Sequence, residues 1–396
     1  MDVTAAAESN TSIVEQMIWG EDAQDRWLEI AAAGPVHRTG SGVMIATAAG
    51  VDEALHDPSR FSSDPKAIYL GSDTGLIPLQ VDPPEHVRYR KMLDPLFAPR
   101  KMAALEDGVA ALVNRCIDGL IERGSCDFSE EIAVPIPSGT FLQLLGLPLS
   151  RLDEFLAVKD DMIRPSGATQ DEQNAKRGAA GQWVFAMYGE ALDERHAAPS
   201  DDILSHFAAL EKSGELTREE TLNICFLLLT AGLDTVTDTL ECSLAFLARH
   251  PDHRRQLVAD PSLIPHAVEE LLRYETPVPG IARVAEVDTE IGGCPVAKGD
   301  LVSVLIATYN VDASVFPEPL TVDFHRGVNA HIAFGAGVHR CLGSHLARME
   351  LRVVLREWHR RIPDYRLTDG HVLMYSPALR EIRRLPLEFT PGRREA

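Results

Sequence analysis

The sequence predicts a mainly helical protein with small β-sheets, and three observations support this fold class. Apolar residues recur at three-to-four spacing through the middle of the chain. Strand-like runs are fewer and clustered. One predicted helix is long enough to cross a whole domain. The other predicted helices span 101–123, 139–158, 171–195 and 201–212, and the strand-like runs span 36–46, 281–287, 300–306 and 365–389.

The long helix has a clear beginning and end in the sequence. Thr217 and Glu220 form a capping-box pattern at its start, and the helical pattern continues until His250 meets Pro251. At about 1.5 Å per residue the helix would span roughly 48 Å. We therefore expect its central residues, Ala231–Thr235, to lie in the middle of the molecule.

The composition is that of a folded globular protein. The chain has 396 residues, of which 45% are hydrophobic and 24% charged. The length alone would allow about two or three domains, but no repeat or Ser/Gly-rich linker divides the sequence. We predict one domain over 1–396, with a β-rich part at approximately 34–70 and 279–306 plus a C-terminal hairpin, and a helical remainder.

Charge and cysteine content exclude several classes of protein. The net charge of −21 argues against general nucleic-acid binding. Met1–Asn10 lacks a secretory pattern, and the most apolar stretch, Ile224–Leu233, is too short to cross a bilayer. The six cysteines show no zinc or iron–sulfur spacing, and a disulfide scaffold is not expected. We predict a cytoplasmic protein without a membrane span.

The strongest chemical signal is a glycine-rich loop around one cysteine. Residues 334–343 read Phe-Gly-Ala-Gly-Val-His-Arg-Cys-Leu-Gly and precede an amphipathic helical run through Arg361. Glycine permits the positive φ angles of a tight loop. Cys341 would then lie at a helix start, where amides and the helix dipole favour a thiolate that binds a metal. A buried neutral thiol is the ordinary alternative, and the glycine spacing favours the metal ligand.

Two further patterns are weaker by themselves. Glu270 and Arg273 lie three residues apart, and the ordinary interpretation of such a pair is an exposed ion pair on a helix. Asp234 and Thr235 place an acid beside an alcohol at the centre of the long helix. An acid and a hydroxyl can relay protons, although a local helix kink or a solvated face is the alternative interpretation.

Taken together, these motifs resemble the cytochrome P450 family. Its haem-binding signature, Phe-x-x-Gly-x-x-x-Cys-x-Gly, is matched by Phe334, Gly337, Cys341 and Gly343. The resemblance runs from about Asp82 to the carboxyl end. It implies the P450 fold, with the long central helix over haem b and the cysteine loop on the opposite side. Cys341 would be the axial ligand, whose thiolate favours cleavage of the oxygen–oxygen bond, and Phe334 would shield the sulfur side of the ring.

The resemblance also implies roles for residues outside the cysteine loop. Thr235 would order dioxygen and a water molecule, and Asp234 would pass protons inward. Glu270 and Arg273 would join Arg326 in a structural triad without a chemical role. The other residues that it places around the haem are Ala231 on the long helix and four holders of the two propionate carboxylates, His86, Arg90, Arg283 and His339.

Substrate and partners follow from the same resemblance. The expected pocket walls are mostly apolar, which suits a terpenoid, steroid or fatty acyl substrate. They span 61–77, 161–169, 227–231, 277–281 and 376–379. No Gly-x-Gly-x-x-Gly fingerprint for a flavin or nicotinamide is present, so electrons must come from elsewhere. The basic run 88–101, with Arg340, Arg348 and Arg352, could dock an acidic ferredoxin.

That ferredoxin would be reduced by a ferredoxin reductase with NAD(P)H as the ultimate donor, and we expect the enzyme to be a monomer. Two alternatives remain open at this point. A haem-thiolate carrier or sensor would bind ligands without turnover, although Asp234 and Thr235 argue against it. A helical scaffold without haem would require several ordered motif matches to arise by chance.

Overall fold

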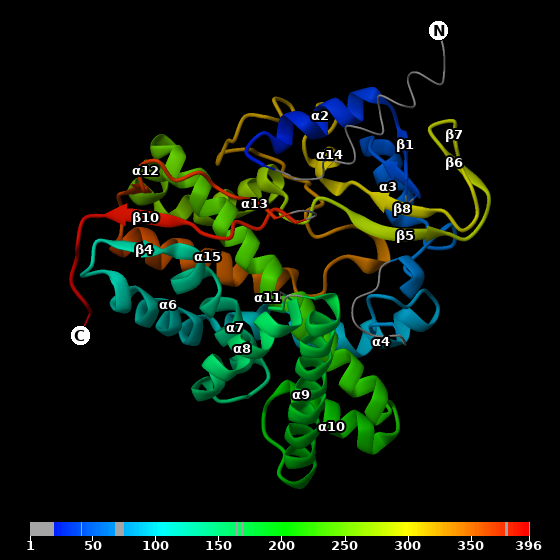
Figure 1. The fold of residues 1–396 in the computed structure, drawn as a ribbon, viewed down its shortest axis with the longest axis horizontal. Coiled ribbons are helices and arrows are strands. Elements are labelled where there is room, and N and C mark those ends of the chain that lie inside the picture. Colours follow the sequence, from blue (N-terminus) through cyan, green and yellow to red (C-terminus); the bar gives the residue numbers. More distant parts are fainter. Residues whose placement is uncertain are drawn as a thin grey trace.

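The computed structural model describes residues 20–40, 42–67, 75–163, 165–167, 169–376 and 379–395. Helices dominate this part of the chain and small sheets accompany them, which confirms the predicted fold class (Figure 1). The helices are α2 (Ala23–Ala33), α3 (Ala48–His56), α4 (Glu85–Leu93), α5 (Pro99–Ala103), α6 (Glu106–Leu120), α7 (Pro135–Leu144), α8 (Leu152–Ile163), α9 (Gln170–Ala197), α10 (Ile203–Ser213), α11 (Arg218–Arg249), α12 (Pro251–Ala259), α13 (Ile264–Glu275), α14 (Ile306–Asn310) and α15 (Ser344–Arg361).

The largest sheet has the strand order β1-β2-β8-β5-β3. All its neighbouring strands are antiparallel except β2 and β8, which pair in parallel. Its strands come from the two ranges in which the sequence places the β-rich part. They are β1 (Val36–Thr39), β2 (Gly42–Ile45), β3 (Phe61–Ser62), β5 (Ile281–Ala285) and β8 (Leu301–Val304).

Two smaller sheets complete the β structure of the described residues. In one, β10 (Pro386–Phe389) pairs with both β4 (Ser125–Asp127) and β9 (Tyr365–Leu367), which gives the expected C-terminal hairpin an additional strand. The other is the hairpin β6 (Thr289–Ile291) and β7 (Cys294–Val296). β6 and β7 lie within the predicted β-rich range 279–306, but they are not among the strand-like runs, and β4 lies outside both. Strands of three residues are too short for an alternating pattern to stand out.

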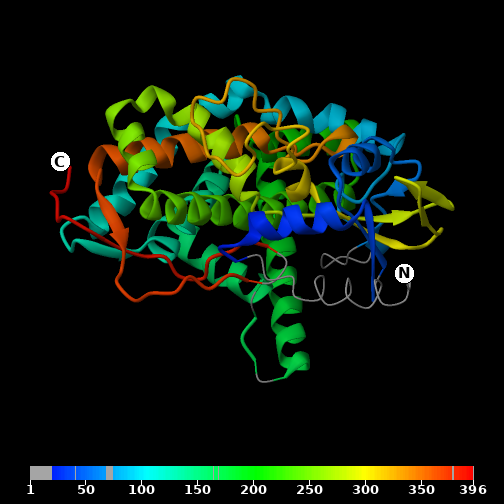
Figure 2. The same cartoon turned by 90° about the horizontal axis from the view of Figure 1, so that it is seen from above.

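The long helix is present as predicted. α11 has 32 residues, and both bonds of its capping box form: the Glu220 amide donates to Thr217 Oγ1 at 3.1 Å and the Thr217 amide to Glu220 Oε2 at 2.7 Å. α11 runs through the middle of the molecule in both views and contacts α7, α9, α13 and α15 (Figure 1, Figure 2). Its middle therefore lies among these helices, although Ala231 is exposed and Asp234 and Thr235 are half-buried.

Two predicted helices are each broken in the structure. The helix expected over 139–158 is wrong: α7 ends at Leu144 and α8 begins at Leu152. Gly146 has φ +69°, and a Cβ there would lie 2.4 Å from Asp202 Oδ2, so the chain turns where a side chain has no room. The helix expected over 101–123 divides between α5 and α6 at residues 104–105. Apolar spacing continues across both breaks, so periodicity alone could not locate them.

Candidate active site

The cysteine loop is closed by backbone hydrogen bonds and two glycines. The Cys341 amide donates to the Phe334 carbonyl at 2.8 Å, directly before α15. Gly335 and Gly337 have φ of +67° and +66°, and a Cβ on Gly337 would lie 2.1 Å from the Leu55 carbonyl oxygen. Gly343 differs, because its φ of −79° is open to any residue.

Part of the Cys341 residue is exposed, but its sulfur is surrounded by protein, and this burial raises the pKa of the thiol. The Gly343 amide and the charges of Arg90, Arg340 and Arg348 oppose this effect without overcoming it. The prediction of a thiolate-prone sulfur, which rested on amides and the helix dipole, is therefore wrong for the polypeptide alone. A coordinated metal ion deprotonates a thiol that binds it, so the chemistry of this sulfur fits a metal ligand.

Phe334 lies beside the loop under an arginine. The Arg348 guanidinium carbon is 4.4 Å from the centre of the Phe334 ring. Arg348 also donates two hydrogen bonds of 2.7 Å to Glu269, which accepts a third contact from His331 at 3.1 Å. We expected Arg348 on a docking surface, but its guanidinium is held by Glu269 of α13 and by the ring of Phe334.

His86 and Arg283 are buried polar groups whose hydrogen-bonding capacity is not used up. His86 is 2% exposed, and neither of its ring nitrogens has a hydrogen-bond partner among the described residues. Burial, with the nearby His339 and Arg90, lowers the pKa of His86 to about 4. Arg283 is 5% exposed, and burial lowers its pKa to about 10. It donates to the Ala282 carbonyl at 2.8 Å, but no described carboxylate forms an ion pair with it.

His339 and Arg90 lie around this pair. The His339 ring centre is 4.3 Å from that of His86, and His339 Nε2 is 3.7 Å from Asp82 Oδ1, too far for a hydrogen bond. Arg90 donates to Asp94 at 2.7 Å and to the Arg340 carbonyl at 2.8 Å, which ties α4 to the cysteine loop. Buried donors without acceptors are complementary to carboxylates. His86, His339 and Arg283 offer such donors and fit the carboxylates expected there, whereas Arg90 lies beside them with two acceptors already in place, Asp94 and the Arg340 carbonyl.

The acid and the alcohol of α11 both have partners. Thr235 Oγ1 donates to the Ala231 carbonyl at 3.1 Å, one turn earlier. Asp234 Oδ1 lies 2.7 Å from Lys159 Nζ of α8, and Lys159 is only 4% exposed. Sequence reasoning missed Lys159. The available signal was its place four residues after the buried Phe155, on the apolar face of α8.

Lys159 also faces a small cavity between α8, α9 and α11. The lining residues are Phe155, Val158, Lys159, Met162, Val184, Leu229 and Thr230. Two of the expected pocket walls, 161–169 and 227–231, contribute to it. Of the other walls, positions 68–74 within 61–77 and positions 377–378 within 376–379 lie outside the described residues.

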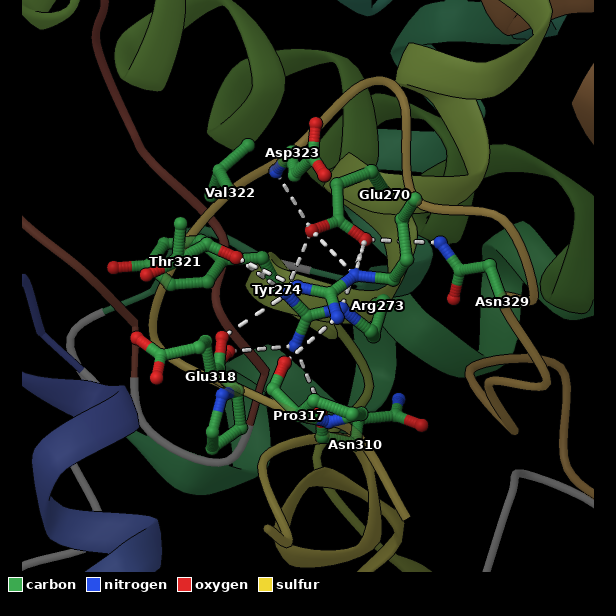
Figure 3. Close-up of polar contacts among 12 residues, drawn as sticks. Glu270, Arg273, Tyr274, Asn310, Pro317, Glu318, Thr321, Val322, Asp323 and Asn329 are labelled. Atoms are coloured by element: carbon green, nitrogen blue, oxygen red, sulfur yellow. Dashed lines mark hydrogen bonds and ion pairs between the residues drawn. The ribbon is translucent and has the colours of Figure 1, made fainter.

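Glu270, Arg273 and Arg326 meet, as the resemblance implies, and Figure 3 shows Glu270 and Arg273 with their polar partners. Arg273 donates to the two carboxylate oxygens of Glu270 at 2.9 and 2.8 Å, and Arg326 Nε lies 3.1 Å from both. Glu270 and Arg273 are fully buried, and the Asn329 side chain and the Asp323 amide complete the carboxylate's partners. Arg273 further donates to the Asn310 and Pro319 carbonyls. The triad therefore links α13 to the end of α14 and to the segment that follows it.

Comparisons with known proteins all point to one family. A family model described as "Cytochrome P450" matches residues 176–358. A protein named probable cytochrome P450 127A1, from Sinorhizobium fredii, is 38% identical over 84% of this chain and 80% of its own. Steroid C26-monooxygenase from Mycobacterium tuberculosis is 34% identical over 93% of each chain. The solved structure of cytochrome P450 CYP109Q5 from Chondromyces apiculatus has a TM-score of 0.85 at 32% identity, covering 93% of this chain and 95% of that one.

Among the described residues, no helix combines the length and the apolar character that crossing a membrane requires.

Proposed function

Because the chain belongs to the cytochrome P450 family, whose members bind haem b and act as monooxygenases, we propose that it hydroxylates a lipophilic small molecule with ferredoxin-supplied electrons. Family membership sets aside a helical scaffold without haem, and the relatives named as monooxygenases set aside a carrier without turnover. The proposal depends above all on one observation. A single cysteine loop lies near His86, whose ring nitrogens have no hydrogen-bond partner among the described residues, and near Arg283, which donates only to a backbone carbonyl and has no carboxylate partner among them.

We assign the haem to this chain's own residues. Cys341 would be the iron ligand, and Phe334 would shield the sulfur side of the ring. Gly343 lies beside the sulfur, because a Cβ at this position would be 4.0 Å from Cys341 Sγ, in ordinary van der Waals contact. The propionates would be held by His86, Arg90, Arg283 and His339, with Ala231 of α11 on the other side of the ring. When bound, the haem supplies the iron at which dioxygen is activated.

Asp234 and Thr235 are the proposed catalytic residues, because they offer a carboxylate and a hydroxyl side by side on α11. Thr235 can turn its hydroxyl proton from the Ala231 carbonyl toward the haem side, and Asp234 can pass protons to it. Lys159 fixes the Asp234 carboxylate through the 2.7 Å ion pair. Glu270, Arg273 and Arg326 are assigned no chemical step, and they hold the chain around the cysteine loop.

The substrate class is supported by the mostly apolar residues of the expected walls and by one relative. The small cavity between α8, α9 and α11 is apolar apart from Lys159 and Thr230, but its volume of about 10 Å³ holds no more than a water molecule, so it is not itself the substrate pocket. The Mycobacterium tuberculosis relative is named a steroid monooxygenase. We therefore propose a terpenoid, steroid or fatty acyl substrate, with steroids first. Titration with a panel of such lipophiles should shift the spin state of the haem, and the absence of any shift would reject this substrate class.

The electron donor is proposed to be a ferredoxin with its reductase and NAD(P)H. The basic surface for it is smaller than the sequence predicts, because Arg88 pairs with Glu220 at 2.9 Å and Arg348 pairs with Glu269. The exposed cations that remain are Lys91, Arg100, Lys101 and Arg340. An acidic partner would complement these charges.

A cytoplasmic monomer of one domain over 1–396 completes the proposal. The six cysteines are free thiols, which agrees with a reducing compartment.

The test is the carbon monoxide difference spectrum of the purified protein. Thiolate ligation gives a red-shifted absorption, and we expect the native protein to show it and Cys341→Ser to lose it. Cys126→Ser is the matched control, because Cys126 is a buried thiol on β4 in another part of the fold. Porphyrin bound without the red-shifted band in the native protein would contradict the assignment. His86→Ala with Arg90→Ala should weaken haem retention, and unchanged retention would reject the propionate assignment.

A further inference from the structure

A second buried ion pair lies beside two of the proposed pocket walls. Arg380 Nη1 is 2.6 Å from Glu275 Oε2, and the two side chains are only 1% and 3% exposed. The same nitrogen donates to the Glu275 carbonyl at 2.7 Å. Glu275 ends α13, two residues before the wall 277–281 begins, and Arg380 directly follows Leu379, the last residue of the expected wall 376–379. The pair therefore joins two segments that are 105 residues apart in sequence.

The two segments are also joined through their backbones. The Arg380 amide donates to the Pro277 carbonyl at 3.0 Å. Between Glu275 and Pro277, Thr276 has φ +36°, a conformation that residues other than glycine rarely adopt. Thr276 Oγ1 holds this turn by donating to the Arg273 carbonyl at 2.7 Å. The chain thus leaves α13 in one fixed direction.

Arg380 contacts three other parts of the fold. Cys242 Sγ of α11 donates to its carbonyl at 3.0 Å, and the guanidinium lies 5.5 Å from the ring centres of both Trp27 and Tyr375. It also donates to the Gly20 carbonyl at 3.2 Å. Residue 380 therefore fixes the chain next to Leu379 relative to α11, α13 and the segment that precedes α2.

A buried ion pair is a poor source of stability, because removing two charges from water costs about as much as their attraction returns. Apolar residues of similar size are often as stable or more so. What such a pair provides is a defined geometry between the segments that carry it. Here the segments that carry the pair lead into two of the expected pocket walls, so the pair bears on the shape of the pocket.

We propose that the Glu275–Arg380 pair is a positioning device for substrate selectivity: it fixes the wall 277–281 relative to Leu379, the last residue of the expected wall 376–379. This inference rests on the proposed function, in which the expected walls surround the substrate. Neither residue is a catalytic residue, since both act through the segments that they hold.

The experiment uses the haem-loaded protein and the double variant Glu275→Leu with Arg380→Met, which removes both charges and so leaves no buried charge unpaired. Arg380→Lys, which keeps the charge and loses the fork of donors, is the conservative second variant. The probes are a series of azoles of increasing size. They bind haem iron directly, so their relative affinities report the shape of the pocket whichever substrate is native.

We expect both variants to keep the red-shifted carbon monoxide band. In the double variant the affinity ratio of bulky to small azoles should change by about tenfold, with a smaller change in Arg380→Lys. The matched control is Asp118→Leu with Arg361→Met, an ion pair of 2.6 Å between α6 and α15, which should keep the native ratio. A ratio within about twofold of the native value in the folded double variant would overturn the proposal, as would an equal change in the control.

Failure of the proposed substrate class is a separate result. It would appear as the absence of any lipophile-induced spin shift in the native protein, while the azole series would still report the pocket shape.

Discussion

Burial, more than sequence spacing, sets the chemical state of individual residues in this protein. The glycine loop predicts a reactive sulfur, but burial raises the pKa of the Cys341 thiol despite three nearby arginines. Burial likewise lowers the pKa of His86 to about 4, so this side chain is neutral at pH 7 and has one ring N–H that could donate to a bound carboxylate. Environment therefore decides what each group contributes, as expected for ionisable groups in a low-dielectric interior.

Glu350 gives a residue-scale prediction about pH. It is fully buried on α15, and burial raises its pKa well above the ordinary 4.5. Above about pH 4.5 the unfolded chain loses this proton while the folded protein keeps it, so the free energy of unfolding falls as pH rises, by at most about 1.4 kcal/mol per unit. Glu350→Gln should therefore raise the melting temperature between pH 5 and 8 and flatten its pH dependence.

Melting curves of the native protein and the variant at several pH values provide this measurement. Glu190→Gln, at an exposed position on α9, should leave the pH dependence as it is. An identical pH dependence in native protein and Glu350→Gln would contradict the prediction.

The cysteine loop gives a second residue-scale prediction. Gly335 and Gly337 have nearly the same positive φ, but only at Gly337 does a Cβ meet backbone, 2.1 Å from the Leu55 carbonyl; at Gly335 the nearest atom is an Ile281 methyl at 3.4 Å. Gly335→Ala should therefore cost only the strain of the left-handed conformation, about 1–2 kcal/mol. Gly337→Ala should cost more and reduce haem content. Denaturation and haem quantification would measure both, and equal losses would contradict this account.

At the scale of elements, the contact between α8 and α11 has a functional consequence. Lys159 and Asp234 form a nearly buried ion pair, so the position of α8 is coupled to the carboxylate proposed to pass protons. Breaking such a pair by removing one partner leaves the other charge uncompensated, at a cost of about 3–5 kcal/mol when both are buried. The Asp234 carboxylate would then reorient toward water or other donors.

We therefore expect Lys159→Met to lower kcat several-fold and to increase the NAD(P)H consumed per product formed. Binding of a spin-shifting lipophile should change less, because the methionine keeps the apolar part of the side chain. Lys212→Met, at an exposed position on α10, is the control. Native turnover and coupling in Lys159→Met would show that the ion pair has no part in the reaction.

At the scale of the whole molecule, a net charge of −21 makes any basic surface a local exception. Lys91 on α4 and Arg100 on α5 are exposed. Lys91 is next to Arg90, which links α4 to the cysteine loop through the Arg340 carbonyl. An acidic ferredoxin would be repelled by most of the molecule and attracted to this surface.

Reversing both charges, Lys91→Glu with Arg100→Glu, should slow reduction by an acidic ferredoxin several-fold at low salt. The difference should shrink at high salt, where exposed charges are screened. Lys298→Glu, on the exposed turn between β7 and β8, is the control. Stopped-flow reduction rates would measure the effect, and rates that do not respond to the double reversal would reject this docking surface.

The sequence by itself determined the features that are local or have a strict pattern. They include the capped α11, the cysteine loop, the Glu270–Arg273 spacing and the placement of strands near 34–70 and 279–306. Each depends on residues within a few positions of one another, or on turn chemistry that only glycine supplies. Such patterns can be found without knowing the fold.

Only the tertiary structure decided the break at Gly146, the raised pKa of Cys341 and the Lys159–Asp234 and Glu275–Arg380 pairs. Each arises where segments far apart in the chain pack together: Gly146 meets Asp202, and Arg380 meets a residue a hundred positions earlier. Desolvation and the partner of a buried charge are properties of that packing. No periodicity along the chain carries this information, because it depends on which surfaces exclude water from one another.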